Sequence, residues 1–210
     1  MKEKIPTEVK KLYHKNNLKT KLYIILRWRL CPFEKIESLL PKFGTIVDIG
    51  CGYGLLTNFL ALKSDKRSVI GIDNSFKRIK IAQTTVDKRS NIEFTLTDLR
   101  KFKLPKCQAV VMSDLLHHLS EEAIFNLLKR IYNQLNAGGL LIIEEVNNKP
   151  FWKYLSNIFI DHLLYPKQKI RFKTINQWEK ILREIGFIFQ VFEAHQGLPL
   201  ADTIFICTKK

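Results

Sequence analysis

A glycine-rich turn directly after an apolar strand constrains the fold of this chain more than any other segment. Residues 45–47 read as a strand, and the sequence Asp-Ile-Gly-Cys-Gly-Tyr-Gly follows at 48–54, before an apolar helical run. Only residues without a Cβ let a turn approach a ligand closely while its N–H groups point outward. The order of strand, glycine turn and helix predicts an α/β fold that holds a nucleoside-bearing cofactor at the turn.

The spacing of the glycines distinguishes between cofactors. A dinucleotide-binding turn reads Gly-x-Gly-x-x-Gly and places a pyrophosphate at the helix N-terminus, whereas Leu55 stands here in place of the third glycine. The carboxylate of Asp48 would repel a pyrophosphate but suits a ligand that carries an ammonium group. Taken alone, the glycines also suit a nicotinamide enzyme or a plain turn.

The run from Asp48 to Gly54 resembles the first motif of the class I S-adenosylmethionine-dependent methyltransferases. The cofactor of that family is a sulfonium with an amino-acid tail, so the resemblance implies S-adenosylmethionine as the cofactor. The resemblance covers residues 44–146 in detail and 174–208 in outline. The residues that it implies at the methionine end of the cofactor are Asp48, Gly50, Cys51, Gly52 and Gly54.

The next two strands end in acidic residues that suit the rest of such a cofactor. The strand at 68–73 ends in Asp73, where related folds place a carboxylate that binds the ribose hydroxyls, and Asn74 continues that site. The third strand runs into Asp98 and Leu99, which resemble the family's adenine-contacting corner. Taken alone, Asp98 equally suits a helix cap.

A fourth strand, at 107–112, opens into a stretch with two adjacent histidines at 113–119. This stretch resembles the Asp-x-Leu-His-His-Leu sequence that many small-molecule methyltransferases of the class carry after their fourth strand. The resemblance implies that Ser113 and Asp114 contribute to the cofactor site.

The histidines are the leading candidates for catalysis, because the end of a central parallel strand opens into the substrate crevice. His118 is predicted as the general base ahead of His117, since imidazole titrates near neutral pH. Glu145, at the end of the fifth strand, is the second choice. Glu144 and Glu145 alternate across that strand, so at most one faces the site. The alternative is that the leucines of 115–119 pack in the core and both histidines lie at the surface. A divalent metal held by Asp114 and a neighbouring acid is an alternative, but no clear metal-ligand set is present, so no metal is predicted.

Strands and helices alternate along the chain, which predicts a Rossmann-like, doubly wound α/β fold with helices on both faces of the sheet. The sheet is predicted to be seven-stranded and mostly parallel, with an antiparallel last strand. The remaining helices are predicted at 54–63, at 75–88 with Ser75 as its cap, at 120–135, and from a capping box at Thr174 to Gly186. The remaining strands are predicted at 140–146, 187–194 and 202–208.

Two segments outside the shared core are predicted to choose the acceptor. Residues 1–43 are expected to form a basic and aromatic helical cap before the methyltransferase domain at 44–210. A lid-like insertion is predicted at 147–173, because this connection is far longer than an ordinary αβ loop and leaves the carboxyl end of a strand. Its aromatic and aliphatic residues suit either a wall for a greasy substrate or a helix that covers the core.

The net charge of +15 predicts attraction to anions. Eleven lysines and arginines, with interleaved aromatic residues, lie before the first strand. This pattern suits an anionic membrane surface and RNA equally well, and also a solvated face without a partner. No apolar run is long enough to span a membrane and no secretory signal opens the chain, which predicts a cytoplasmic protein. The basic and aromatic segment adds the expectation of peripheral contact with an anionic membrane, with nucleic acid as the alternative partner.

The methyl acceptor is predicted to be a hydrophobic small molecule or lipid-like compound, methylated at oxygen or an activated carbon. Enzymes that methylate base amines typically carry an Asn/Asp-Pro-Pro-aromatic motif after the fourth strand, and residues 113–116 lack it. Cys107 lies at the wrong end of its strand for a cytosine-carbon enzyme. An RNA methyltransferase acting on ribose or base is the alternative enzyme. The alternative of another class is a regulatory protein that binds the cofactor without transferring its methyl group.

Overall fold

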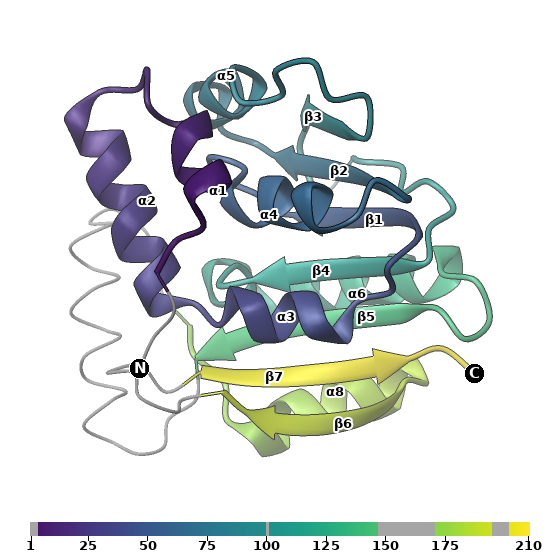
Figure 1. Ribbon diagram of the computed structural model, residues 1–210. Helices are drawn as coiled ribbons and strands as arrows, with labels where there is room; N and C mark the ends of the chain where they lie inside the picture. The colour runs from purple at the N-terminus through teal and green to yellow at the C-terminus, as the bar shows by residue number, and fades with distance from the viewer. Residues whose placement is uncertain (1–3, 100, 147–170, 195–201) are drawn as a thin grey trace.

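Seven strands form one sheet (Figure 1). A computed structural model describes residues 4–99, 101–146, 171–194 and 202–210 of the chain. The strands are β1 (Gly44–Ile49), β2 (Arg67–Asp73), β3 (Ile92–Leu96), β4 (Ala109–Ser113), β5 (Leu140–Val146), β6 (Ile188–Glu193) and β7 (Asp202–Thr208). They follow the order β3-β2-β1-β4-β5-β7-β6, and β7 pairs antiparallel with both β5 and β6 while the other pairs are parallel. This confirms the predicted doubly wound, mostly parallel sheet.

Helices cover both faces of the sheet, as predicted. The helices after the first strand are α4 (Leu55–Lys63), α5 (Phe76–Gln83), a short 3-10 turn η1 (Leu116–His118), α6 (Glu121–Gln134) and α8 (Ile175–Ile185). Ile46 and Val111 pack on the face that α4 and α5 cover, and Val47 and Met112 pack on the face that α6 and α8 cover. Successive side chains of a strand point to opposite faces, so β1 and β4 bury apolar residues in both layers.

Two of the predicted helix starts are confirmed in detail. The side chain of Ser75 accepts the N–H of Arg78 and caps α5. Thr174 and Gln177 form the capping box that begins α8. These side chains satisfy backbone N–H groups that the first turn of a helix leaves without a partner.

The helix predicted at 75–88 is wrong over its last turn, because α5 ends at Gln83. The hydroxyls of Thr84 and Thr85 donate to carbonyls of the preceding turn, and Asp87 adopts a left-handed backbone with φ of 53°. Such side-chain bonds to the backbone compete with the continuation of a helix.

Three helices precede the sheet: α1 (Thr7–Leu12), α2 (Leu18–Leu30) and α3 (Phe33–Leu39). Helix α2 lies along one edge of the molecule, at the carboxyl ends of the parallel strands (Figure 1). Trp28 of α2 packs edge-on against Phe59 of α4, with ring centroids 4.9 Å apart. The hydroxyl of Tyr13 donates to the carbonyl of Tyr53 at 2.9 Å. These contacts hold the N-terminal helices against the glycine turn.

Candidate active site

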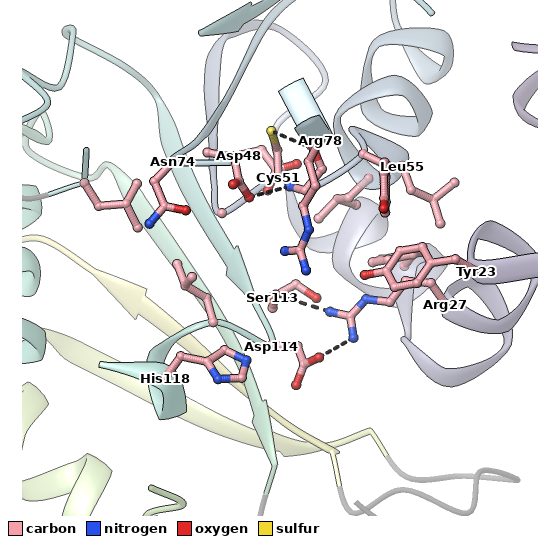
Figure 2. A pocket seen from close by; sticks show the side chains of 18 of the residues that line it. Tyr23, Arg27, Asp48, Cys51, Leu55, Asn74, Arg78, Ser113, Asp114 and His118 are labelled. Carbon is pink, nitrogen blue, oxygen red and sulfur yellow. Dashed lines mark hydrogen bonds and ion pairs between the residues drawn. The ribbon is translucent and has the colours of Figure 1, made fainter. Parts of the chain in front are cut away.

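A cavity of about 230 Å³ lies at the carboxyl ends of β1, β2 and β4 (Figure 2). Its walls come from α2, the glycine turn, the end of β2, α5 and the loop after β4. The chain leaves β1 toward β2 on one side and reaches β4 on the other, and open α/β sheets bind ligands at such a point. The predicted site residues that line the cavity are Asp48, Gly50, Cys51, Gly52, Asp73, Asn74, Leu99, Ser113, Asp114 and His118.

Glycine is required at two positions of the turn for different structural reasons. Gly52 has a φ of 56° and borders the cavity, and a Cβ there would meet no atom within 4 Å. Gly54 has a φ of 77° and begins α4, and a Cβ there would lie 2.4 Å from Cζ of Phe94. Gly52 therefore leaves open space beside the ligand site, whereas Gly54 lets α4 pack closely on β3.

The first N–H groups of the turn, those of Gly50, Cys51 and Gly52, do not point outward, which corrects the prediction from sequence. Those of Gly50 and Cys51 donate to the carbonyl of Ile72, at 2.8 and 3.0 Å. The N–H of Gly52 donates to Oδ2 of Asp73 at 2.9 Å. The glycines thus allow a close approach of the backbone, while the N–H groups join the turn to the end of β2.

Asp73 lies between the turn and the next helix. In addition to the bond from Gly52, its Oδ1 accepts the N–H of Ser75 at 2.7 Å. Each carboxylate oxygen has a second lone pair, and Asp73 lines the cavity. The carboxylate is therefore oriented by the backbone and can still accept hydroxyl groups of a ligand, as a ribose site requires.

Asp48 is buried behind the turn, where it accepts a hydrogen bond from the hydroxyl of Thr57 at 2.6 Å. Burial raises the pKa of Asp48 to about 7, the bond from Thr57 opposes this shift, and the charge of Asp73 adds to it. A cationic group in the cavity would favour the ionised carboxylate. Two carboxylates at one end of the cavity fit the ammonium group and the ribose of S-adenosylmethionine.

Asp98 lies outside the first cavity and borders an adjoining hollow. Asn74, Leu99 and His118 line both spaces. Of the predicted adenine corner, Leu99 therefore borders the space that Asp73 lines, whereas Asp98 borders only the adjoining hollow.

The loop after β4 is tied to α2. Asp114 has a left-handed backbone, with φ of 55°, and forms an ion pair with Arg27. Burial alone would raise the pKa of Asp114, but the Arg27 guanidinium and the neighbouring histidines outweigh burial and lower that pKa. The hydroxyl of Ser113 donates to Oε2 of Glu144 at 2.6 Å. The residues predicted on this loop thus face the cavity in one fixed arrangement.

Glu145 and His117 lie behind the loop and are absent from the described lining of the cavity. Oε1 of Glu145 accepts the N–H groups of Leu115 and Leu116, and Oε2 lies 2.7 Å from Nδ1 of His117. His117 is 1% exposed. These two predicted catalytic candidates therefore brace the loop that carries His118.

His118 is the one predicted catalytic side chain among the described lining residues. Burial lowers its pKa to about 4, and the adjacent His117 adds to this effect. The two imidazole rings are 4.1 Å apart between centroids. His118 is therefore neutral at pH 7 and has a ring nitrogen able to accept a proton.

Nine of the described lining residues were not predicted from the sequence as site residues, and three of these are polar side chains on helices. Tyr23 and Arg27 come from α2, and Arg78 comes from α5 (Figure 2). The four-residue spacing of Tyr23 and Arg27 indicates a shared helix face, but only the packing of α2 shows that this face meets the cavity. Residues 147–170, most of the predicted lid, lie outside the described residues.

The described parts of the chain contain no group of three or more His, Cys, Asp and Glu side chains that could hold a metal ion. None of their helices has the length and apolar character needed to cross a membrane.

Part of the chain is similar to known methyltransferases. A family model described as "Methyltransferase domain" matches residues 46–139, which include the glycine turn, Asp73, Asp98 and both histidines. This match, the strand order and the relatives below support a class I S-adenosylmethionine-dependent methyltransferase family for this chain.

Two curated relatives and one solved structure illustrate the likeness. The chain is 29% identical to (S)-coclaurine N-methyltransferase of Thalictrum flavum subsp. glaucum over 110 residues, 51% of this chain and 30% of the relative. It is 32% identical to the mitochondrial ubiquinone biosynthesis O-methyltransferase of Mus musculus over 146 residues, 65% of this chain and 37% of the relative. These matches span less than half of each relative. Magnesium protoporphyrin IX methyltransferase from Synechocystis PCC 6803, solved with bound SAH, shares the fold with a TM-score of 0.70 at 18% identity, over 97% of this chain and 93% of that one.

Proposed function

We propose that this protein transfers the methyl group of S-adenosylmethionine to a hydrophobic small-molecule or lipid-like acceptor, at an oxygen or an activated carbon. The position of His118 carries the proposal, because this neutral imidazole lines the same cavity as Asp48, Gly52 and Asp73. Base and predicted cofactor site therefore share one space.

The walls of the cavity support an apolar acceptor. Tyr23 and Phe33 from the N-terminal segment, and Leu115 and Leu119 from the loop after β4, line it together with His118. Such side chains bind an apolar group and exclude water from the reacting atoms. The two curated relatives are an N- and an O-methyltransferase, so the preference for oxygen or carbon rests on the residues of this chain.

The residues of the chain then have separate tasks. S-adenosylmethionine, when bound, supplies a methyl group on a cationic sulfur, a good leaving group. His118 accepts the proton of an acceptor hydroxyl as its oxygen becomes the nucleophile. His117 and Glu145 act as positioning residues that hold the loop of His118. Asp48 binds the methionine end of the cofactor and Asp73 binds its ribose. Asp98 and Leu99 contact the adenine.

The acceptor can be identified with methyl-labelled S-adenosylmethionine and cell extract, followed by mass spectrometry. Label in apolar compounds, lost in His118→Ala and retained in His14→Ala, is the expected result, since His14 is exposed and lies in the turn after α1. Label in RNA would favour the alternative enzyme. Cofactor binding without any transferred label would favour a regulatory protein.

A further inference from the structure

Helix α2 exposes three leucines in a row. Leu18, Leu22 and Leu26 are exposed by 70%, 57% and 40%. Residues four apart lie above one another on one helix face, so these side chains form one stripe, here called the α2 stripe. Single exposed leucines are ordinary, whereas a contiguous apolar surface indicates an interaction site.

The other faces of α2 contact the core and the cavity. Ile24 and Trp28 are buried in the core, at 2% and 5% exposure. Tyr23 and Arg27, on a third side, face the cavity (Figure 2). The helix is therefore held in place without the α2 stripe, and the stripe points away from both core and cavity.

The charges around the α2 stripe are of one sign. Residues 9–33 contain seven lysines and arginines and no aspartate or glutamate. Lys15, Lys19 and Arg29 are exposed beside the leucines. A helix with an apolar stripe and basic flanks is complementary to an anionic phospholipid surface, where leucines enter the acyl boundary and cations meet phosphate groups.

We propose that the α2 stripe docks this protein on an anionic membrane, with α2 lying in the plane of the interface. Tyr23 and Arg27 lie on the neighbouring side of the same helix, so docking brings the cavity close to the membrane. An apolar acceptor dissolved in the bilayer could then reach the cavity without crossing water. This last consequence rests on the proposed function, whereas the docking itself does not.

The test is sedimentation of the purified full chain with vesicles of phosphatidylcholine alone or with about 30% phosphatidylglycerol, at low salt and at about 0.3 M salt. We expect binding to the anionic vesicles that weakens with salt. Leu22→Ser should lower the partition coefficient about tenfold. Lys19→Glu should lower it about fivefold at low salt.

Matched controls lie at the amino ends of β1 and β2, whereas α2 lies at the carboxyl ends of the parallel strands (Figure 1). Phe43, just before β1, is 63% exposed, and Lys66, just before β2, is exposed. Phe43→Ser and Lys66→Glu should bind vesicles like the wild type. S-adenosylhomocysteine binding should be unchanged in Leu22→Ser, so that loss of docking is separable from failure of the proposed function.

Several outcomes would overturn the proposal. These are no wild-type binding to anionic vesicles, equal losses in the control variants, or binding that is indifferent to lipid charge. A dimer in light scattering that Leu22→Ser abolishes would assign the α2 stripe to a second copy. A marked loss of unfolding free energy in Leu22→Ser would show that residues of the same chain cover it.

Discussion

Arg27 of α2 forms an ion pair with Asp114, which directly follows β4, although 87 residues separate them. Their side chains are only 14% and 10% exposed. Arg27 also donates to the carbonyl of Ser113 at 3.4 Å. The pair therefore joins the N-terminal helices to the loop that carries His118 and fixes α2 over the cavity.

Loss of one partner should be costly because the other charge stays buried. Arg27→Met should lower the free energy of unfolding by about 3 kcal/mol, and the double variant with Asp114→Asn should recover part of that loss. Urea unfolding followed by circular dichroism measures both. The control is Arg183→Met, which breaks the exposed pair with Glu179 and should change stability by less than about 0.5 kcal/mol. Similar losses at both sites would contradict a buried pair.

Asp48 should make cofactor binding depend on pH. Its pKa of about 7 means that it is largely protonated at pH 6 in the free protein, and a bound ammonium group would favour the carboxylate. Affinity for S-adenosylhomocysteine should therefore rise with pH, by up to about tenfold per unit below pH 7. Calorimetry at pH 6 in two buffers of different ionisation enthalpy should show nearly one proton released. The Asp48→Asn variant should release no proton on binding. An equal proton release from that variant would show that Asp48 is not the group that ionises.

The same group should shape the stability of the free protein. The pKa of Asp48 is raised from an ordinary value near 4, so folding favours its protonated form. The stability that protonated Asp48 contributes to the folded state is fully present below about pH 4 and is lost as the pH rises through 7. The free energy of unfolding should therefore fall between about pH 5 and pH 8, and Asp48→Asn should flatten that fall. Urea titrations across this range test the sign, and a steeper fall in the variant would refute it.

The sequence predicts those features that depend on neighbours along the chain. The glycine turn and the caps at Ser75 and Thr174 have local patterns, and the structure confirms them. The place of Arg27 in the cavity wall has no such signal, because it depends on how α2 packs across the strand ends. The direction of Glu145 also depends on distant groups, since the backbone N–H groups after β4 draw its carboxylate behind the loop.

The two glycines should respond differently to the same methyl group. Gly52→Ala should cost about 1 kcal/mol of stability, from its left-handed backbone alone, and should weaken cofactor binding because the methyl group enters the cavity. Gly54→Ala should cost about 3 kcal/mol, because the backbone strain adds to a clash with Phe94. Urea unfolding and calorimetry separate the two effects. A larger loss of stability in Gly52→Ala than in Gly54→Ala would contradict the assignment of close packing to Gly54 and of open space to Gly52.

Asp73 should determine affinity for the nucleoside half of the cofactor. Asp73→Ala should weaken S-adenosylhomocysteine binding about thirtyfold or more, since hydrogen bonds to a charged group are lost. Asp65→Ala, at an exposed site before β2, is the control and should bind normally. Asp73→Asn keeps an oxygen for only one of the two backbone N–H groups that Asp73 accepts, so urea unfolding of both variants is needed to separate ligand binding from support of the turn. Unchanged affinity in both variants at Asp73 would remove it from the ribose site.

His118 should control the rate of transfer rather than the binding of the cofactor. His118→Ala should lower turnover at saturating cofactor by about a hundredfold or more, with little change in S-adenosylhomocysteine affinity. Because the pKa of His118 is lowered to about 4, the wild-type rate should be flat from about pH 6 to pH 8 and fall only in more acidic solution. His117→Asn is the informative comparison, since it alters the brace against Glu145 and should change the pH profile while leaving a base in the cavity. A rate that rises through pH 7 at saturating cofactor would point to a base other than His118.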